Sequence, residues 1–565
     1  MSINLSPSAQ SALDHSCPVL ILGGPGSGKT TISLLKAKRL LRGLKPGQEV
    51  LFLSFSRAAV RQVEIACKSI LTSDEKRRIE VRTYHSFAIN ILHTYGRLLT
   101  GRPPHILSPL QENLAKASFN GNWASESKRL AEEEGQYVLG QVAEAASKLI
   151  SGSSAIAEIV ADKYPFIIFD EFQDTADDQW EMVKILSRKS GMVFLADPKQ
   201  IIFDYDPRVS AQRVEHVRQF LHPAEFDFQG ENHRSSNTGI LEYADALLDN
   251  RQLPKYANVK ECNFWPNNFE EVFHAEVYRI FSQLHKDGIK QPTVAVLARS
   301  NRLVSKLSLI LETERKFQER TLRPIAHDVL WNTELSAAAA VVVASILEWP
   351  QQEEAAALYN TLNCIADYFD IKFAIRSTKN AQTLSAKYRA AAGKVKQGKK
   401  QRIATLKYLS DCFRSLTAYT GDPVHDWVHA RDFISKCKDL SPLYDNVRFV
   451  RLFRATDDVG KLLSSAWDKK GHYRGSMARI RRVLETRVIQ GAYHIANKCN
   501  IMTIHKAKGK EFDGVVLVEG KNQHDSFFSK NDSAEKQQAK RRILRVAITR
   551  AKSRVLILRP KTSLY

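Results

Sequence analysis

Residues 18–35 read PVLILGGPGSGKTTISLL, an apolar run followed by a glycine-rich turn and the start of a helical segment. Gly23, Gly28, Lys29 and Thr30 fit the pattern G-x-x-x-x-G-K-[ST], in which backbone N–H groups cradle phosphates between a strand and a helix. The lysine of such a loop reaches the β- and γ-phosphates, and the next hydroxyl holds Mg²⁺. A nucleoside triphosphate site is therefore predicted, with this set of residues: Gly23, Gly24, Pro25, Gly26, Ser27, Gly28, Lys29, Thr30 and Thr31.

Similar apolar runs recur along the chain, and each ends on polar or glycine residues. One series comprises PVLILGG (18–24), VLFLSFS (50–56), FIIFDE (166–171) and MVFLAD (192–197), and a later series comprises TVAVLARS (293–300), NIMTIHKAKG (500–509), GVVLVEG (514–520) and RVLILRP (554–560). Continuous apolar runs separated by helical segments are typical of parallel strands that are buried on both faces. The sequence therefore predicts an α/β fold with two parallel-sheet domains.

Two intervals between these runs have a helical composition. The first is 88–160, where helix formers alternate with apolar residues three to four apart, and the second is 336–494. We therefore predict a first sheet domain over 1–87 and 161–273 and a second over 274–335 and 495–565, each interrupted by one of these helical insertions. The longest apolar stretch, LSAAAAVVVASIL (335–347), is too short to span a bilayer and is expected to form a buried helix.

The charge balance points to a partner rich in phosphate. The 565 residues include 83 Lys and Arg against 61 Asp and Glu, a net charge of +22, and an excess of this size favours nucleic acid over a membrane surface. The seven cysteines form no CxxC pair, and the N-terminus lacks the basic-then-apolar order of a secretory signal. We expect a cytoplasmic protein with reduced thiols that binds nucleic acid.

Adjacent acids follow the apolar run at 166–169. Asp170 is suited to the Mg²⁺ that Thr30 would hold, and Glu171 is suited to polarising the attacking water. Hydrolysis also needs cations that stabilise charge on the transferred phosphoryl group. Arg234 in ENHRSS and Arg550 in VAITRAK are the candidates, although either arginine taken alone could be an ordinary surface residue.

Ten short blocks then occur in a characteristic order: LSPSAQSAL, GGPGSGKTT, FLSFSRAAV, RTYHSF, DEFQDT, ADPKQIIF, ENHRSS, VAVLARSN, TIHKAKGKEFDGVVL and RVAITRAK. In this order they resemble the UvrD/Rep/PcrA branch of superfamily 1 DNA helicases. The resemblance implies two RecA-like domains with ATP between them and movement 3′ to 5′ along single-stranded DNA. It also assigns Gln10 to the adenine, Gln200 to sensing the γ-phosphate, Glu511 to the ribose, and Arg234 and Arg550 to arginine fingers.

The same resemblance implies a DNA track. It assigns to that track Phe55, Arg57, Thr83, His85, Phe203, Tyr205, Thr503, His505 and Lys508. Aromatic side chains on such a track can stack bases of any sequence, as a translocating motor requires.

The chain also departs from the family pattern at three places. His233 stands where a tyrosine usually packs on adenine, and Asp204 and Asp206 flank Tyr205 where arginines are usual. In the last block Ala539, Lys540 and Arg545 replace the usual paired glutamates and tyrosine. We expect a looser base preference and a weaker grip on DNA from the first two departures.

Two functions remain open at this stage. The first is an ATP-dependent DNA translocase or helicase acting in DNA repair or anti-phage defence, where UvrD-like subunits of Gabija-type systems are similar in scale. The second is a DNA-stimulated ATPase switch that regulates a partner nuclease without processive unwinding. A small-molecule kinase would use the same phosphate loop but would leave the second α/β domain unexplained.

Overall fold

The computed structural model describes residues 5–202, 208–228, 230–330, 333–376, 379–399, 403–416, 418–448, 458–490, 498–520, 525–529 and 531–561. The chain divides into two compact units. Unit 1 comprises Met1–Pro103, Gly140–Leu330 and Ile495–Tyr565, and unit 2 comprises Pro104–Leu139 and Trp331–His494. Residues 88–160, predicted as one insertion, are therefore shared between the units, and the four-part division proposed from the sequence stays a prediction.

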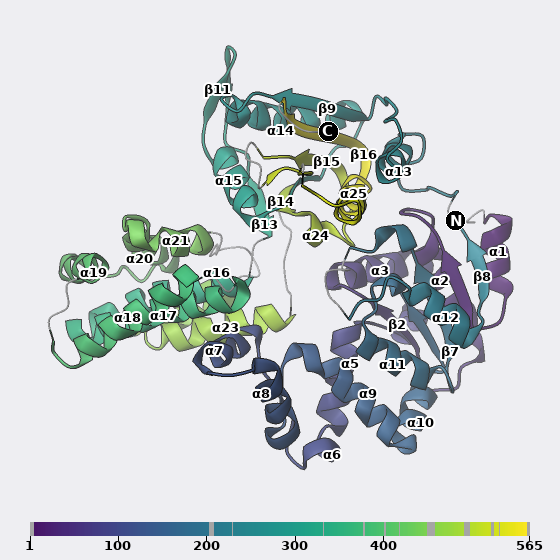
Figure 1. Ribbon diagram of the computed structural model, residues 1–565, viewed down its shortest axis with the longest axis horizontal. Helices are drawn as coiled ribbons and strands as arrows, with labels where there is room; N and C mark the ends of the chain where they lie inside the picture. Colours follow the sequence, from purple (N-terminus) through teal and green to yellow (C-terminus); the bar gives the residue numbers. More distant parts are fainter. Residues whose placement is uncertain are drawn as a thin grey trace. The chain divides into compact units, whose positions relative to one another are not determined.

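Unit 1 contains two six-stranded parallel sheets (Figure 1). The strands of the first sheet, in spatial order, are β3 Ile79–Thr83, β2 Val50–Ser54, β6 Phe166–Phe169, β7 Gly191–Ala196, β1 Val19–Leu22 and β8 Ala224–Asp227. Those of the second are β13 His327–Leu330, β14 Cys499–Thr503, β10 Val294–Ala298, β15 Phe512–Val518, β16 Ala551–Pro560 and β9 Val259–Phe264. The predicted α/β fold with two parallel sheets is confirmed.

Helices pack against these sheets, and the central strands are therefore buried on both faces. Every residue of β1, β2 and β10 is buried, which is the pattern of a parallel sheet between helical layers. The helices associated with the first sheet are α1 Pro7–Asp14, α2 Lys29–Leu40, α3 Arg57–Ile70, α5 Tyr84–Tyr95, α9 Val142–Gly152, α10 Ser154–Lys163, α11 Asp177–Leu186 and α12 Arg213–Leu221. Those of the second are α13 Ile240–Leu248, α14 Phe269–Lys286, α15 Asn301–Glu312, α24 Ile504–Ala507 and α25 Ala534–Ile548.

Strand order decides which loops meet. Strands β6, β7 and β1 are adjacent and parallel, with Ile168 beside Val193 and Val193 beside Val19. The segments that follow these three strands therefore lie at one edge of the sheet, where α/β folds bind ligands. These segments carry the phosphate loop, the Asp170–Glu171 pair and the segment that includes Gln200.

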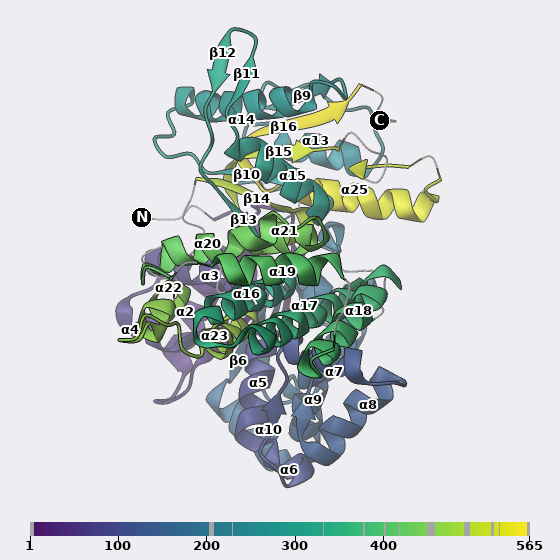
Figure 2. The same ribbon diagram turned by 90° about the vertical axis from the view of Figure 1, so that its left-hand side faces the viewer.

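Unit 2 is a helical bundle (Figure 2). It also contains a two-stranded sheet, β4 His105–Ile106 and β5 Gln136–Tyr137. Its helices are α7 Pro109–Ser118, α8 Trp123–Arg129, α16 Thr333–Leu347, α17 Glu354–Arg376, α18 Lys379–Lys396, α19 Ala404–Ser415, α20 Pro423–Ser435, α21 Ser441–Val447, α22 Asp458–Ala466 and α23 Ser476–Gln490. Helix α16 contains the apolar stretch 335–347 and lies in the centre of the core of unit 2, with Val342 and Val343 fully buried. A helix that is apolar all round must be buried on all sides, and the expected buried helix is confirmed.

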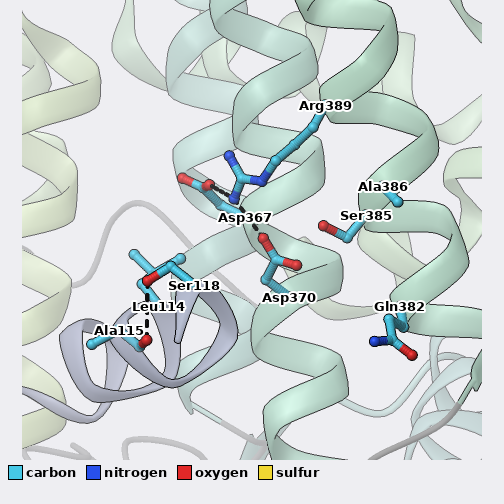
Figure 3. A pocket seen from close by; sticks show the side chains of 9 residues that line it. All are labelled: Leu114, Ala115, Ser118, Asp367, Asp370, Gln382, Ser385, Ala386 and Arg389. Carbon is cyan, nitrogen blue, oxygen red and sulfur yellow. Dashed lines mark hydrogen bonds and ion pairs between the residues drawn. The ribbon is translucent and has the colours of Figure 1, made fainter. Parts of the chain in front are cut away.

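A cavity of about 690 Å³ lies between α7, α17 and α18 (Figure 3). On its wall the Arg389 guanidinium bridges two carboxylates, donating to Asp367 Oδ1 at 2.8 Å and to Asp370 Oδ2 at 2.5 Å. Both acids belong to α17 and the arginine to α18, so these ion pairs fasten the two helices together. No helix in the described part of the chain is long and apolar enough to cross a membrane.

Candidate ATP site

The phosphate loop joins β1 to α2 and depends on glycines in the left-handed region. Gly26 has a φ of 77°, and Gly28, which directly precedes α2, has a φ of 84°. A Cβ on Gly26 would lie 2.5 Å from the Cβ of Arg234, so only glycine fits this approach. The first N–H groups of a helix have no partners within the helix, so the start of α2 offers donors to an anion.

Lys29 and Ser27 show that this loop suits phosphates. The Lys29 ammonium donates to the carbonyls of Gly23 at 2.6 Å and Gly24 at 2.9 Å, so it is folded back on its own loop. Ser27 is 2% exposed, and its hydroxyl has no hydrogen-bond partner among the described residues. The buried Ser27 hydroxyl would gain a hydrogen bond from an oxyanion ligand, and the Lys29 ammonium would exchange neutral carbonyls for a charged partner.

The two acids after β6 have different proton affinities. Asp170 is buried and accepts a hydrogen bond from Ser54 Oγ at 3.1 Å. Burial and the adjacent charge of Glu171 raise the pKa of Asp170 to about 6. Burial would also raise the pKa of Glu171, but Lys508, Lys29 and Arg550 outweigh burial and hold this pKa below its usual value. Glu171 therefore stays ionised to a lower pH than Asp170 does.

Glu171 also has an unusual backbone conformation, with a φ of 52°. A non-glycine residue in the left-handed region costs roughly 1 kcal/mol or more, and such residues concentrate at functional sites. The turn directs the next residues into η4 Phe172–Asp174, where Gln173 donates to Glu171 Oε2 at 2.5 Å.

Residues that follow helices of the second sheet contact residues at the ligand-binding edge of the first sheet. Arg550 follows α25 and donates from Nη2 to Gln200 Oε1 at 2.9 Å. Burial, followed by the charge of Arg234, lowers the pKa of Arg550 to about 10. Arg234 donates to Glu511 Oε1 at 2.5 Å and to the Thr549 carbonyl at 3.2 Å. The structure thus brings together Gln200, Arg234, Glu511 and Arg550, four residues that are far apart in the sequence.

Lys508 lies away from solvent among acids. Its ammonium forms an ion pair with Asp174, donates to the Gln200 carbonyl at 2.8 Å and lies 3.7 Å from Glu171 Oε2. The side chain is 6% exposed and that of Asp174 is 0% exposed. The assignment of Lys508 to a DNA track stays a prediction, and its described contacts are with the acids that follow β6 and with the Gln200 carbonyl. Sequence reasoning did not single out Asp174, although this residue is the third acid of the DEFQD block.

Of the residues predicted near the adenosine, His233 contacts the phosphate loop, whereas the described contact of Gln10 lies within its own helix. The backbone N–H of His233 donates to the Gly26 carbonyl at 2.8 Å, and its ring lies 3.2 Å from Glu231 Oε2. Gln10, in α1, is exposed and donates to Asp14 Oδ2 at 2.7 Å. Thr30 and Thr31 occupy the first turn of α2.

The predicted DNA-track residues of the first sheet follow two neighbouring strands. Ser54 of β2 pairs in register with Thr83 of β3, so Phe55 and His85 follow adjacent strand ends, and Arg57 begins α3. Thr83 Oγ1 accepts from Ser86 N at 3.1 Å and caps α5, so its hydroxyl has a structural partner. In the second sheet, Thr503 ends β14 and His505 lies in α24. Phe203 and Tyr205, with Asp204 and Asp206, lie outside the described residues.

Comparison with known proteins agrees with this arrangement. Residues 5–149 and 132–207 match the family described as the UvrD/REP helicase N-terminal domain, and residues 350–561 match the UvrD-like helicase C-terminal domain. The chain is 22% identical to the putative ATP-dependent DNA helicase YjcD of Bacillus subtilis, over 96% of this chain and 77% of the relative. It is also 22% identical to a probable DNA helicase II homolog of Mycoplasma pneumoniae, over 95% of this chain and 81% of the relative.

A third relative is matched over a shorter length. The ATP-dependent DNA helicase Rep of Buchnera aphidicola is 24% identical over 359 residues, which are 53% of this chain and 55% of the relative. The chain thus spans about half the length of this relative. The two family matches together cover strands of both sheets and more than half of the chain, and the protein therefore belongs to the UvrD/Rep family of helicases.

Proposed function

We propose that this protein is an ATP-dependent motor that moves 3′ to 5′ along single-stranded DNA and unwinds duplexes, in DNA repair or anti-phage defence. The observation that carries the proposal is the pair of contacts Arg550–Gln200 and Arg234–Glu511. Arg550 and Glu511 follow helices of the second sheet, α25 and α24. Their partners Gln200 and Arg234 follow strands of the first sheet, β7 and β8.

The residues of the phosphate loop would hold ATP and Mg²⁺. Lys29 and the N–H groups at the start of α2 would bind the phosphates, and Thr30 with Asp170 would hold the metal ion. When bound, ATP with Mg²⁺ supplies the phosphoryl group whose transfer to water releases free energy. Glu171, held ionised by Lys508, Lys29 and Arg550, is the group that can accept a proton from the attacking water.

Coupling to movement follows from where the cations originate. Lys29 belongs to the first sheet, whereas Arg550 follows α25 of the second. A site whose cations are supplied by two sheets is complete only when both are in place, so hydrolysis can be linked to their relative motion. DNA would run past the residues that follow β2, β3 and β14, and the net charge of +22 favours binding to its phosphates.

The test is ATP turnover with and without single-stranded DNA, followed by strand displacement. We expect DNA to raise turnover and a duplex with a 3′ tail to be unwound, with a duplex carrying a 5′ tail as the matched control. Absence of DNA stimulation would contradict a DNA motor altogether. Strong stimulation without displacement of either duplex would favour the alternative function, a DNA-stimulated switch that regulates a partner nuclease.

A further inference from the structure

Arg545 is a buried arginine whose partners tie α25 to two other elements. It is 2% exposed. Its Nε donates to Asp245 Oδ1 in α13 at 2.7 Å, and its Nη1 lies 3.4 Å from Oδ2 of Asp197, which follows β7. Loss of one partner of a buried ion pair is costly because a charge remains without compensation. The two carboxylates therefore keep the Arg545 guanidinium in one position.

Asp197 in turn sets the orientation of Gln200. Its Oδ2 accepts from Gln200 Nε2 at 2.8 Å, and its Oδ1 accepts from the Lys199 N–H at 2.9 Å. An amide has a donor end and an acceptor end, so a carboxylate at Nε2 fixes which end points elsewhere. Gln200 therefore presents Oε1, an acceptor, to the Arg550 guanidinium.

These contacts close a ring that begins and ends at α25. The order is Arg545, Asp197, Gln200 and Arg550, and Arg550 Nε donates to the carbonyl of Val546 within the same helix at 3.0 Å. Asp197, Gln200, Arg545 and Arg550 are each at most 4% exposed. Because water cannot compete for these groups, each contact constrains the next.

We propose that Arg545 is a positioning residue for ATP hydrolysis: through Asp197 it fixes the amide of Gln200, and Gln200 in turn fixes Arg550. This inference rests on the proposed function of the same site. The residue stands where the family resemblance leads us to expect a tyrosine, so the ring is a feature of this chain's own sequence. The competing role is a structural one, in which Arg545 only fastens α25 to α13 through Asp245.

The first experiment compares three arginine variants in steady-state ATP turnover. We expect Arg545→Met to lower kcat about tenfold, as for loss of one charge-assisted hydrogen bond, with KM changed less than about twofold. Arg545→Lys keeps a cation toward Asp197 and should recover most of kcat. Arg541→Met is the matched control, because Arg541 is buried one turn earlier in α25 and lies over the Phe528 ring; this variant should keep the wild-type kcat.

The second experiment is a double-mutant cycle. If Arg545 acts through Gln200, the variant carrying both Arg545→Met and Gln200→Ala should turn over ATP as fast as Gln200→Ala alone, within about twofold. If the losses of turnover from the two substitutions instead multiply in the double variant, the inference is overturned.

A third measurement does not depend on turnover. Hydrogen exchange of the nucleotide-free protein should be faster over η5 Pro198–Gln200 in Arg545→Met than in Arg541→Met, since Asp197 caps η5. Unchanged exchange would overturn the inference. Should Arg545→Met fail to fold, Arg545→Gln carries the same three tests. Wild-type protein that hydrolyses no ATP would refute the proposed function, whereas active wild type with unaffected Arg545 variants would refute this inference alone.

Discussion

The ion pair between Lys508 and Asp174 supports a prediction about stability and pH. Asp174 is fully buried, and its Oδ1 has no hydrogen-bond partner among the described residues. Lys508→Met keeps a side chain of similar length but leaves this carboxylate without its ammonium. Breaking a buried ion pair in this way costs about 3–5 kcal/mol while the remaining group is ionised.

The cost depends on pH because Asp174 can take up a proton. Burial raises the pKa of Asp174 from 3.8 in a model peptide to about 7, in spite of the attraction of Lys508. A carboxyl whose pKa is higher in the folded chain binds a proton more tightly there, so its contribution to stability falls as pH rises between the two values. Without Lys508 the pKa of Asp174 in the folded chain moves higher still. The variant therefore becomes less stable than wild type above about pH 7.

Thermal unfolding at two pH values measures this deficit. We expect Lys508→Met to lower Tm by roughly 5 °C at pH 8.5, and by much less at pH 6, where Asp174 is neutral. Adding Asp174→Asn should recover most of the loss at pH 8.5. Lys510→Met is the matched control, because the Lys510 ammonium donates to the Lys506 carbonyl and, among the described residues, to no acid.

Equal losses of Tm at pH 6 and pH 8.5 would refute the reasoning, because a loss that does not change with pH cannot arise from the charge of Asp174. A variant that melts within 1 °C of wild type at pH 8.5 would show that the pair contributes nothing.

Three further predictions concern ATP and DNA. Lys29→Ala should lower ATP turnover at least about 100-fold and leave binding of single-stranded DNA measurable by fluorescence polarisation; retained turnover would refute the phosphate-loop assignment. Gly26→Ala should raise the KM for ATP at least severalfold, because its Cβ would lie 2.5 Å from the Arg234 Cβ and the loop must shift; an unchanged KM would contradict this. Affinity for single-stranded DNA should fall at least about tenfold between 50 and 200 mM salt, and a flat response would rule out phosphate-dominated binding.

The central strands of both sheets could be predicted from the sequence, and the edge strands could not. All eight apolar runs form strands, and these are the four inner strands of each sheet. Within these two sheets, the four strands that the runs did not reveal are β3, β8, β9 and β13, which are the edges. An inner strand of a parallel sheet is buried on both faces and must be apolar throughout. Strand β8, with the sequence AEFD, has no buried residue and carries no such pattern.

The candidate site shows a similar limit. The phosphate loop and the acids after β6 are local motifs, so spacing alone indicates them. The contacts of Lys508 and Arg545 join residues more than 300 positions apart. A basic residue in a chain of net charge +22 gives no sign of whether it meets phosphate, solvent or a buried carboxylate. Only the fold, which sets the two sheets' loops beside one another, identifies its partner.

The order of strands in the second sheet bears on how the protein is synthesised. Strand β10 lies between β14 and β15, but residues 299–498 separate it from β14 along the chain. The first sheet has all its strands once residue 227 has been translated. We therefore expect β10 to emerge from the ribosome about 200 residues before either of its neighbours, with both of its edges exposed, and to need protection from aggregation until the last 70 or so residues follow.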